Sequence, residues 1–328
     1  MNLRKEINKK GFFLIAEIGN NHGGNLAVAK KMIIAAHKSG ADAIKLQHII
    51  PERLVHPSQK KRIKQLKKIC LSRAQIFKLF DFAKKKKINI FASIFDLVEI
   101  KNFIHKQKYF KIASGDNNIE ELYKQISKIK KPTFISTGFL DHKNIPSIYK
   151  FIKKYWSKKF AIENICVMHC VSSYPTSDHE LNLRSINSLD KNFLVGFSDH
   201  SIGIDNCIYA HLLGAKIIEK HFTLNKKNKS FRDHMLSADP DDLKKLRDKL
   251  LKINIKLGDT KKKLSYSEKK HSFLSRRSPA YRENLKKNDL LTIDNICYLR
   301  PENKRSNIKI KKMLNKRIKS KKNKNQYI

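Results

Sequence analysis

Acidic residues are scarce in this chain of 328 residues: 29 Asp and Glu stand against 71 Lys and Arg. Cysteine is scarce too, and its five residues lie far apart except for Cys166 and Cys170. An odd number of scattered cysteines argues against a disulfide framework or a zinc cage, so we expect reduced packing residues. No apolar run approaches the roughly 18 residues needed to cross a membrane. These absences favour a cytoplasmic protein with no membrane partner.

The amino terminus is basic and then apolar, as secretory signals are. Its apolar part is short, contains Glu17, and is followed by no small-residue cleavage site. We therefore interpret this part as the first strand of a soluble protein.

The shortage of acids leaves a formal net charge of +42. Such a charge could serve nucleic-acid binding. The lysines, however, are spread over nearly every expected helix and turn, and aromatic residues are not interleaved with the basic runs as base stacking requires. The pattern favours a general compositional bias, whose positive field attracts small anions.

Short apolar segments alternate with helical patterns along the chain. The expected strands cover residues 12–18, 41–46, 88–92, 109–113, 132–135, 164–168, 193–197 and 215–218. Eight strand–helix units in about 250 residues predict a (β/α)₈ TIM barrel, with a doubly wound sheet as the alternative. We expect this α/β barrel domain at 1–258, a charged linker at 259–275, and a small β-rich domain at 276–328.

A histidine follows each of the last two expected strands, His200 after 193–197 and His221 after 215–218. A right-handed crossover makes these strands parallel neighbours, so both polar ends lie at one edge of the sheet. Alternation places Ser198 on the face of His200, and Glu219 on the face of His221. Two imidazoles with a carboxylate nearby could hold a divalent metal and leave positions open for water or substrate.

Other polar residues also stand at expected strand ends, where the active site of a barrel lies. They are Glu17, Lys45, Ser93, Lys111, Ser114, Ser136 and Ser198. Lysines and hydroxyls around one cleft suit a phosphate or a carboxylate.

These residues belong to motifs that occur in the same order in a known family. The motifs are Ile15-Ala16-Glu17-Ile18-Gly19 with Asn21-His22-Gly23-Gly24, Lys45-Leu46-Gln47, Lys111-Ile112-Ala113-Ser114-Gly115, Ser136-Thr137-Gly138, His169-Cys170 with Tyr174-Pro175, Ser198-Asp199-His200, Glu219-Lys220-His221-Phe222-Thr223, Asp233-His234 and Arg300-Pro301. In this set the chain resembles the sialic acid synthases, with their legionaminate and pseudaminate relatives. The resemblance implies a barrel followed by an antifreeze-like (SAF) domain.

The resemblance also implies a reaction, in which phosphoenolpyruvate condenses with the open-chain aldehyde of an N-acylated hexosamine. The products are a nine-carbon 2-keto acid and phosphate, and the metal is Mn²⁺ or Mg²⁺. His200 and His221 would hold that metal, and Glu219 would orient a water bound to it. Phosphoenolpyruvate would contact Lys45, Ser93, Lys111, Ser114, Ser136, Ser198 and Ser172, the last standing where the family often has asparagine.

For the sugar, the resemblance implies contacts from Glu17, Tyr174 and Asp233, with Arg300 on the N-acyl group. Gln47 is a further expected substrate-binding residue. The resemblance further implies a domain-swapped homodimer in which Arg300 serves the other subunit. A different phosphoenolpyruvate-dependent sugar synthase and a non-catalytic, basic nucleic-acid-binding protein remain the alternatives.

Overall fold

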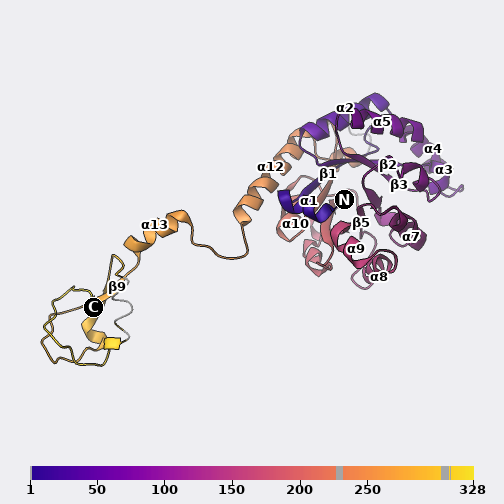
Figure 1. Ribbon diagram of the computed structural model, residues 1–328. Coiled ribbons are helices and arrows are strands. Elements are labelled where there is room, and N and C mark those ends of the chain that lie inside the picture. Colours follow the sequence, from indigo (N-terminus) through magenta and orange to yellow (C-terminus); the bar gives the residue numbers. More distant parts are fainter. Residues whose placement is uncertain (1, 227–231, 304–309, 311) are drawn as a thin grey trace. The chain divides into compact units, whose positions relative to one another are not determined.

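The structure is a computed structural model that describes residues 2–226, 232–303, 310 and 312–328 (Figure 1). The chain divides into two compact units, Met1–Leu257 and Gly258–Ile328. In the part of the chain that is described, no helix has both the length and the apolar character to span a bilayer.

The first unit is a barrel of eight parallel strands in the order β3-β2-β1-β8-β7-β6-β5-β4. The strands are β1 (Phe13–Gly19), β2 (Ala43–His48), β3 (Ile90–Ile94), β4 (Phe110–Ile112), β5 (Thr133–Ser136), β6 (Ile165–Cys170), β7 (Leu194–Asp199) and β8 (Ile217–His221). Between β3 and β4 the side chain of Gln107 takes the place of a strand pairing, because it accepts from Ala92 N at 2.9 Å and donates to Ala92 O at 3.3 Å. The barrel is therefore nearly closed, as the sequence predicted.

Helices surround this barrel, as Figure 1 shows. They are α1 (Leu3–Lys10), α2 (Leu26–Lys38), α3 (Pro51–Leu54), α4 (Lys60–Ile69), α5 (Arg73–Lys85), α6 (Ile100–Phe103), α7 (Glu120–Ile129), α8 (Pro146–Tyr155), α9 (Lys158–Asn164), α10 (Asp205–Leu212), α11 (Arg232–Leu236) and α12 (Pro240–Leu257). Side chains cap several of them: Asn25 accepts from Ala27 N and Val28 N at the start of α2, and Ser72 forms a capping box with Gln75 at α5.

Two apolar clusters pack the barrel. The larger one joins the outer faces of the strands to the helices. The smaller one fills the barrel interior with Phe13, Phe91, Tyr109 and Phe134, and it also includes Leu3 and Ile7 of α1. Helix α1 thus covers the end of the barrel where the strands begin, which leaves the carboxyl ends of the strands for the site.

Several local elements differ from the sequence prediction. Helix α1 was not predicted, and α3 and α4 lie between β2 and α5, where no strand was expected. Helix α6 is a single turn, and a 3₁₀ helix, Leu183–Ser188, lies between β6 and β7. All five cysteines are free thiols.

The second unit has a small core made of Tyr281, Leu285, Leu291, Ile296, Ile318 and Ile328. Its strands β9 (Ser278–Tyr281) and β10 (Ile296–Leu299) pair antiparallel. The residues predicted to form a linker, 259–275, contain helix α13 (Tyr266–Ser275), which begins at a capping box between Ser265 and Glu268.

Candidate active site

A cavity of about 160 Å³ lies at the carboxyl ends of the barrel strands. It collects most of the polar residues that the sequence singled out. Its lining comprises Glu17, Lys45, Gln47, Ser93, Phe95, Lys111, Ala113, Ser114, Gly115, Ser136, Phe139, Cys170, Ser172, Tyr174, Ser198, His200, Glu219 and His221. Strand alternation explains the gathering, because each of these side chains points inward from a strand end or from the loop that follows it.

Two lysines and two carboxylates form a buried ion-pair network in the cavity. Lys45 Nζ lies 2.7 Å from Glu219 Oε1 and 2.9 Å from Glu17 Oε2, and Lys111 Nζ lies 3.0 Å from Glu219 Oε2. Ser198 Oγ also donates to Glu219 Oε1, at 3.0 Å. Every oxygen of Glu219 is therefore engaged, two of its contacts being with cations.

The environment shifts the pKa values of this network. Burial lowers the pKa of Lys45 to about 8, although Glu219 opposes the shift. For Glu219, burial opposes ionisation, but the charges of Lys111 and Lys45 outweigh it and hold the pKa below its usual range. The carboxylate of Glu219 is thus ionised at neutral pH.

Several hydroxyls in the cavity have no partner within the described part of the chain. The buried hydroxyl oxygens of Ser93, Ser136 and Ser172 make no hydrogen bond there. Ser114 Oγ is engaged only with a sulfur, at 3.4 Å from Cys170 Sγ. Buried hydroxyls without partners are unfavourable unless a ligand satisfies them, and three such donors beside two lysines suit an anion with several oxygens.

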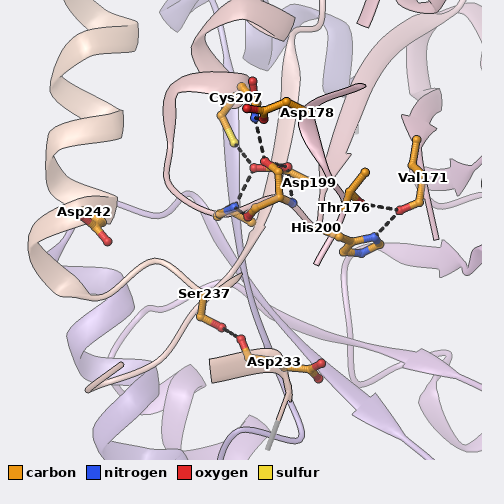
Figure 2. A network of polar contacts seen from close by, with 12 residues as sticks. Val171, Thr176, Asp178, Asp199, His200, Cys207, Asp233, Ser237 and Asp242 are labelled. Atoms are coloured by element: carbon orange, nitrogen blue, oxygen red, sulfur yellow. Dashed lines mark hydrogen bonds and ion pairs between the residues drawn. The ribbon is translucent and has the colours of Figure 1, made fainter. Parts of the chain in front are cut away.

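The two histidines lie side by side at the ends of β7 and β8, with ring centroids 5.4 Å apart. His200 Nδ1 donates to the carbonyl of Val171 at 2.7 Å (Figure 2), so in the neutral ring Nε2 carries the lone pair. His221 Nδ1 is buried and has no hydrogen-bond partner among the described residues. Burial and the neighbouring His200 lower the pKa of His221 well below its usual value, which keeps this imidazole neutral, as a metal ligand must be.

These observations fit a divalent metal held by two imidazoles. Among the described residues, no group of three or more His, Cys, Asp and Glu side chains is placed to bind a metal. Water or substrate oxygens would therefore have to supply the other ligands. A backbone carbonyl that fixes the orientation of a ligating imidazole, as Val171 does for His200, is usual in metal sites.

Cys170, which was predicted to be a packing residue, contributes a thiol to the cavity lining. Its Sγ lies 3.8 Å from His200 Nδ1. Burial raises the pKa of this thiol, but His200 and Ser114 oppose burial and bring the value down to about 7. The pKa of His200 is raised in turn, because Cys170 and the Val171 carbonyl outweigh the effect of burial.

A fully buried ion pair lies directly before the two histidines. Lys220 Nζ is 2.7 Å from Asp199 Oδ2 and donates to the carbonyl of Ser201 at 2.6 Å. Asp199 also accepts from Ser201 N, from Ser201 Oγ and from Cys207 Sγ, and Figure 2 shows the contact with Cys207. Asp199 and Lys220 are paired residues of adjacent strands, so this contact fixes the two strand ends that carry His200 and His221.

Two predicted site residues do not line the cavity. Asp233 lies on α11, where its carbonyl accepts from Ser237 Oγ (Figure 2), and its charge is close enough to act on Tyr174. The pKa of Tyr174 is raised mainly by burial, and then by Cys170 and Asp233. Arg300 belongs to the second unit, where it is exposed and precedes Pro301, whose carbonyl accepts from Tyr327 Oη at 2.7 Å.

Five lining residues were absent from the predicted site: Phe95, Ala113, Gly115, Phe139 and Cys170. Alternation along β6 could have found Cys170, since it is two residues after the inward-facing Met168. Phe139 directly follows Ser136-Thr137-Gly138, but nothing in the sequence sets its direction.

Comparison with known proteins places this geometry in a family. Residues 32–262 match the NeuB family. The chain belongs to the NeuB family. It is 35% identical over 324 residues to N,N'-diacetyllegionaminic acid synthase of Campylobacter jejuni, covering 94% of this chain and 96% of that protein. It is also 33% identical over 311 residues to a pseudaminic acid synthase of the same species, covering 89% and 88%.

A solved structure agrees with this assignment of the chain to the NeuB family. The N-acetylneuraminic acid (sialic acid) synthetase of Leptospira borgpetersenii, in complex with citrate, superimposes with a TM-score of 0.73 at 31% identity. The match covers 79% of this chain and 90% of that one.

Proposed function

We propose that this NeuB-family protein condenses phosphoenolpyruvate with an N-acylated hexosamine to give a nine-carbon 2-keto acid and phosphate. The observation that carries the proposal is one cavity that holds Lys45 and Lys111, three unpartnered serine hydroxyls and two adjacent imidazoles. The named activities of its relatives, which are syntheses of legionaminic, pseudaminic and sialic acids, support the same reaction.

Phosphoenolpyruvate carries a phosphate and a carboxylate, and the cavity offers two cations. Lys45 and Lys111 would each bind one anionic group of the ligand. Each lysine would either leave Glu219 or contact Glu219 and the ligand at the same time. Ser93, Ser136 and Ser172 would donate to the remaining oxygens. Such contacts position C3 of phosphoenolpyruvate for attack on the aldehyde carbon.

We propose that His200 and His221 hold Mn²⁺ or Mg²⁺, and that the bound metal polarises the aldehyde of the sugar as a Lewis acid. His200 is held for this task by the Val171 carbonyl, and His221 by its place in β8 beside β7. The cavity also excludes bulk water, since Lys45, Lys111 and Glu219 are each at most 5% exposed.

A water must add to C2 before phosphate leaves, and a carboxylate must take a proton from that water. Glu219 is occupied by Lys45, Lys111 and Ser198. Glu17 Oε2 lies near Lys45, yet neither oxygen of Glu17 accepts a hydrogen bond from the described residues. We therefore assign the proton transfer to Glu17, and to Glu219 the task of holding the lysines.

We also propose that the active form is a homodimer in which the carboxyl-terminal SAF domain brings Arg300 to the cavity of the other subunit. The second unit has its own small core, so it can move as a separate body. The guanidinium of Arg300 would donate to the N-acyl carbonyl of the sugar.

The test is phosphate release from phosphoenolpyruvate with Mn²⁺ and a panel of N-acetylmannosamine and diacetamido-trideoxyhexoses. We expect release with at least one sugar, and loss of release in His200→Ala and His221→Ala. Mn²⁺ binding, followed by electron paramagnetic resonance without substrate, should weaken in both variants. No release with any sugar, together with salt-dependent DNA binding, would instead support a nucleic-acid-binding protein.

A further inference from the structure

A second cavity, of about 670 Å³, lies in the barrel unit apart from the candidate active site. Its wall is formed by the segment that follows β2, by the end of α4, by the first turns of α5 and by Glu99, which precedes α6. It has no lining residue in common with the active-site cavity, and every residue of its lining is described. A space of this volume can hold a small organic ligand.

A buried histidine in this wall has an unused hydrogen-bonding atom. His48 is 2% exposed, and its Nε2 lies 3.0 Å from Glu99 Oε2. Burial lowers the pKa of His48, although Glu99 opposes the shift, so the ring is neutral at neutral pH. A neutral ring that donates from Nε2 to Glu99 has a lone pair on Nδ1, and Nδ1 accepts from none of the described residues. Such a buried acceptor is unfavourable without a donor, which the hydroxyl group of a ligand can supply.

The first turn of α5 offers donors for an anion. Ser72 caps this helix of 13 residues, since its hydroxyl accepts from Gln75 N and its carbonyl accepts from Ile76 N. The amides of Arg73 and Ala74, which line the cavity together with Ser72, donate to no residue in the described part of the chain. Free amides at the positive end of a helix dipole attract an anion, and phosphate groups commonly bind there.

The charges of the lining favour the same anion. Arg73 binds Glu99 through Nη1 alone, at 2.9 and 3.1 Å from its two oxygens, and its side chain is 48% exposed and open to a ligand. Lys67 also lines the cavity, and its pair with the exposed Glu52 is of a weak kind that a ligand can replace. Glu99, the one acid of the lining, is 7% exposed and is matched by Arg73. The lining therefore keeps one net positive charge.

The rest of the wall is largely apolar. It includes Ile49, Ile50, Pro51, Leu71 and Phe77. An apolar body is stabilised when it covers such a surface and displaces water from it. A ligand that meets every part of the lining thus combines an anionic group, a hydroxyl group and an apolar body.

We infer that this cavity binds a phosphate monoester with a hydroxyl group and an apolar body, the chemistry of a nucleoside monophosphate. The phosphate lies at the first turn of α5 beside Arg73, the ribose hydroxyl donates to Nδ1 of His48, and the base covers the apolar wall. A phosphate fits the turn better than a carboxylate, because its three terminal oxygens can accept from both free amides and the guanidinium at once. This inference does not depend on the proposed condensation.

Isothermal titration calorimetry of the full chain tests each group of the ligand in turn. We expect adenosine 5'-monophosphate to bind at one site. Adenosine, which lacks the phosphate, should bind about 10- to 100-fold more weakly. The 2',3'-dideoxy monophosphate, which lacks the hydroxyls, and ribose 5-phosphate, which lacks the base, should each bind about 10-fold more weakly.

Two variants and a matched control place the ligand in this cavity. His48→Gln keeps an amide donor for Glu99 but removes the acceptor at Nδ1, so it should bind the monophosphate and its dideoxy analogue with equal affinity. Arg73→Gln should weaken the monophosphate about 10-fold and leave adenosine unchanged. The control is Arg53→Gln, because Arg53 has a similar exposure and pairs with Asp96 outside the lining. It should leave both affinities unchanged.

Binding in the active-site cavity is the main competing explanation. Displacement of the monophosphate by phosphoenolpyruvate, or loss of its binding in Lys111→Ala, would overturn the inference. Equal weakening in Arg73→Gln and Arg53→Gln would also overturn it, because the attraction would then come from the general positive charge of the chain. No binding of the monophosphate, or an affinity that the loss of phosphate, hydroxyls or base leaves unchanged, contradicts it as well. Cooperative urea unfolding, followed at the single tryptophan, Trp156, checks that each variant is folded.

Discussion

Replacing Lys220 by methionine should destabilise the barrel by about 3 kcal/mol, because it leaves the buried carboxylate of Asp199 without its cation. Both side chains are fully buried, and their charges are 2.7 Å apart. This loss of stability lies at the lower end of the range for a broken buried ion pair, because Asp199 keeps three other donors: Ser201 N, Ser201 Oγ and Cys207 Sγ. Besides Asp199 Oδ2, the carbonyl of Ser201 also loses its Lys220 donor.

Replacing Asp199 by alanine should cost more, about 5 kcal/mol. This change strands the ammonium of Lys220 with one carbonyl partner and removes the acceptor of three donors. The two single losses would add to about 8 kcal/mol if they were independent. The double variant removes both charges, so we expect about 5 kcal/mol and a coupling of about 3 kcal/mol.

Urea unfolding followed by tryptophan fluorescence measures these losses. The chain has one tryptophan, Trp156, which is buried in the barrel unit and therefore reports on that unit alone. The matched control is Lys249→Met, which breaks an exposed pair with Asp205 at 3.2 Å and should change the stability by less than about 0.5 kcal/mol. Additive losses, or equal losses for Lys220→Met and Lys249→Met, would refute the reasoning from burial.

Three further predictions concern catalysis. Lys45→Ala and Lys111→Ala should each lower kcat/KM for phosphoenolpyruvate about 10- to 100-fold, since each loses a charge-assisted contact of about 1.5–3 kcal/mol; unchanged efficiency in both would remove the anion site. Burial lowers the pKa of Lys45 to about 8, so its charge is present below pH 8 and lost above it. The KM for phosphoenolpyruvate should therefore rise above pH 8. Lys45→Arg keeps its charge at these pH values and should flatten that rise in a pH series. Mixing inactive His200→Ala with inactive Arg300→Ala under subunit exchange should restore activity if the arginine serves the other subunit, whereas a mixture that stays inactive places it in its own.

Much of the barrel could be predicted because its elements follow simple periodicities. The buried strands are short apolar runs, and helices such as α2 and α5 begin at side-chain caps that the sequence displays. The alternation of side chains along a strand also predicted that Ser198, His200, Glu219 and His221 share a face, and all four line the cavity. This prediction works because the face to which a strand side chain points is set by its place in the strand.

What could not be predicted depends on contacts between distant residues. Helix α1 is polar along most of its length. Its buried residues, Leu3 and Ile7, pack against the barrel interior and hold the helix in place. The direction of Phe139 depends on hydrogen bonds from Asn117, a residue of the preceding loop. No local pattern encodes either contact.

The pairing of Glu219 with both lysines gives the charged residues of this site a structural task as well as a place in the substrate cavity. Buried lysines are stable only when an anion is near, and a cavity that binds phosphoenolpyruvate must also exist before it arrives. Two carboxylates supply that anion, and the two lysines balance them, so the network of Glu17, Lys45, Lys111 and Glu219 is neutral as a whole. On the proposed function, phosphoenolpyruvate would become the anionic partner of the lysines, and Glu17, released from Lys45, would accept the proton from water. The same pairs that make the folded site stable would thus prepare the acid–base chemistry of the proposed condensation.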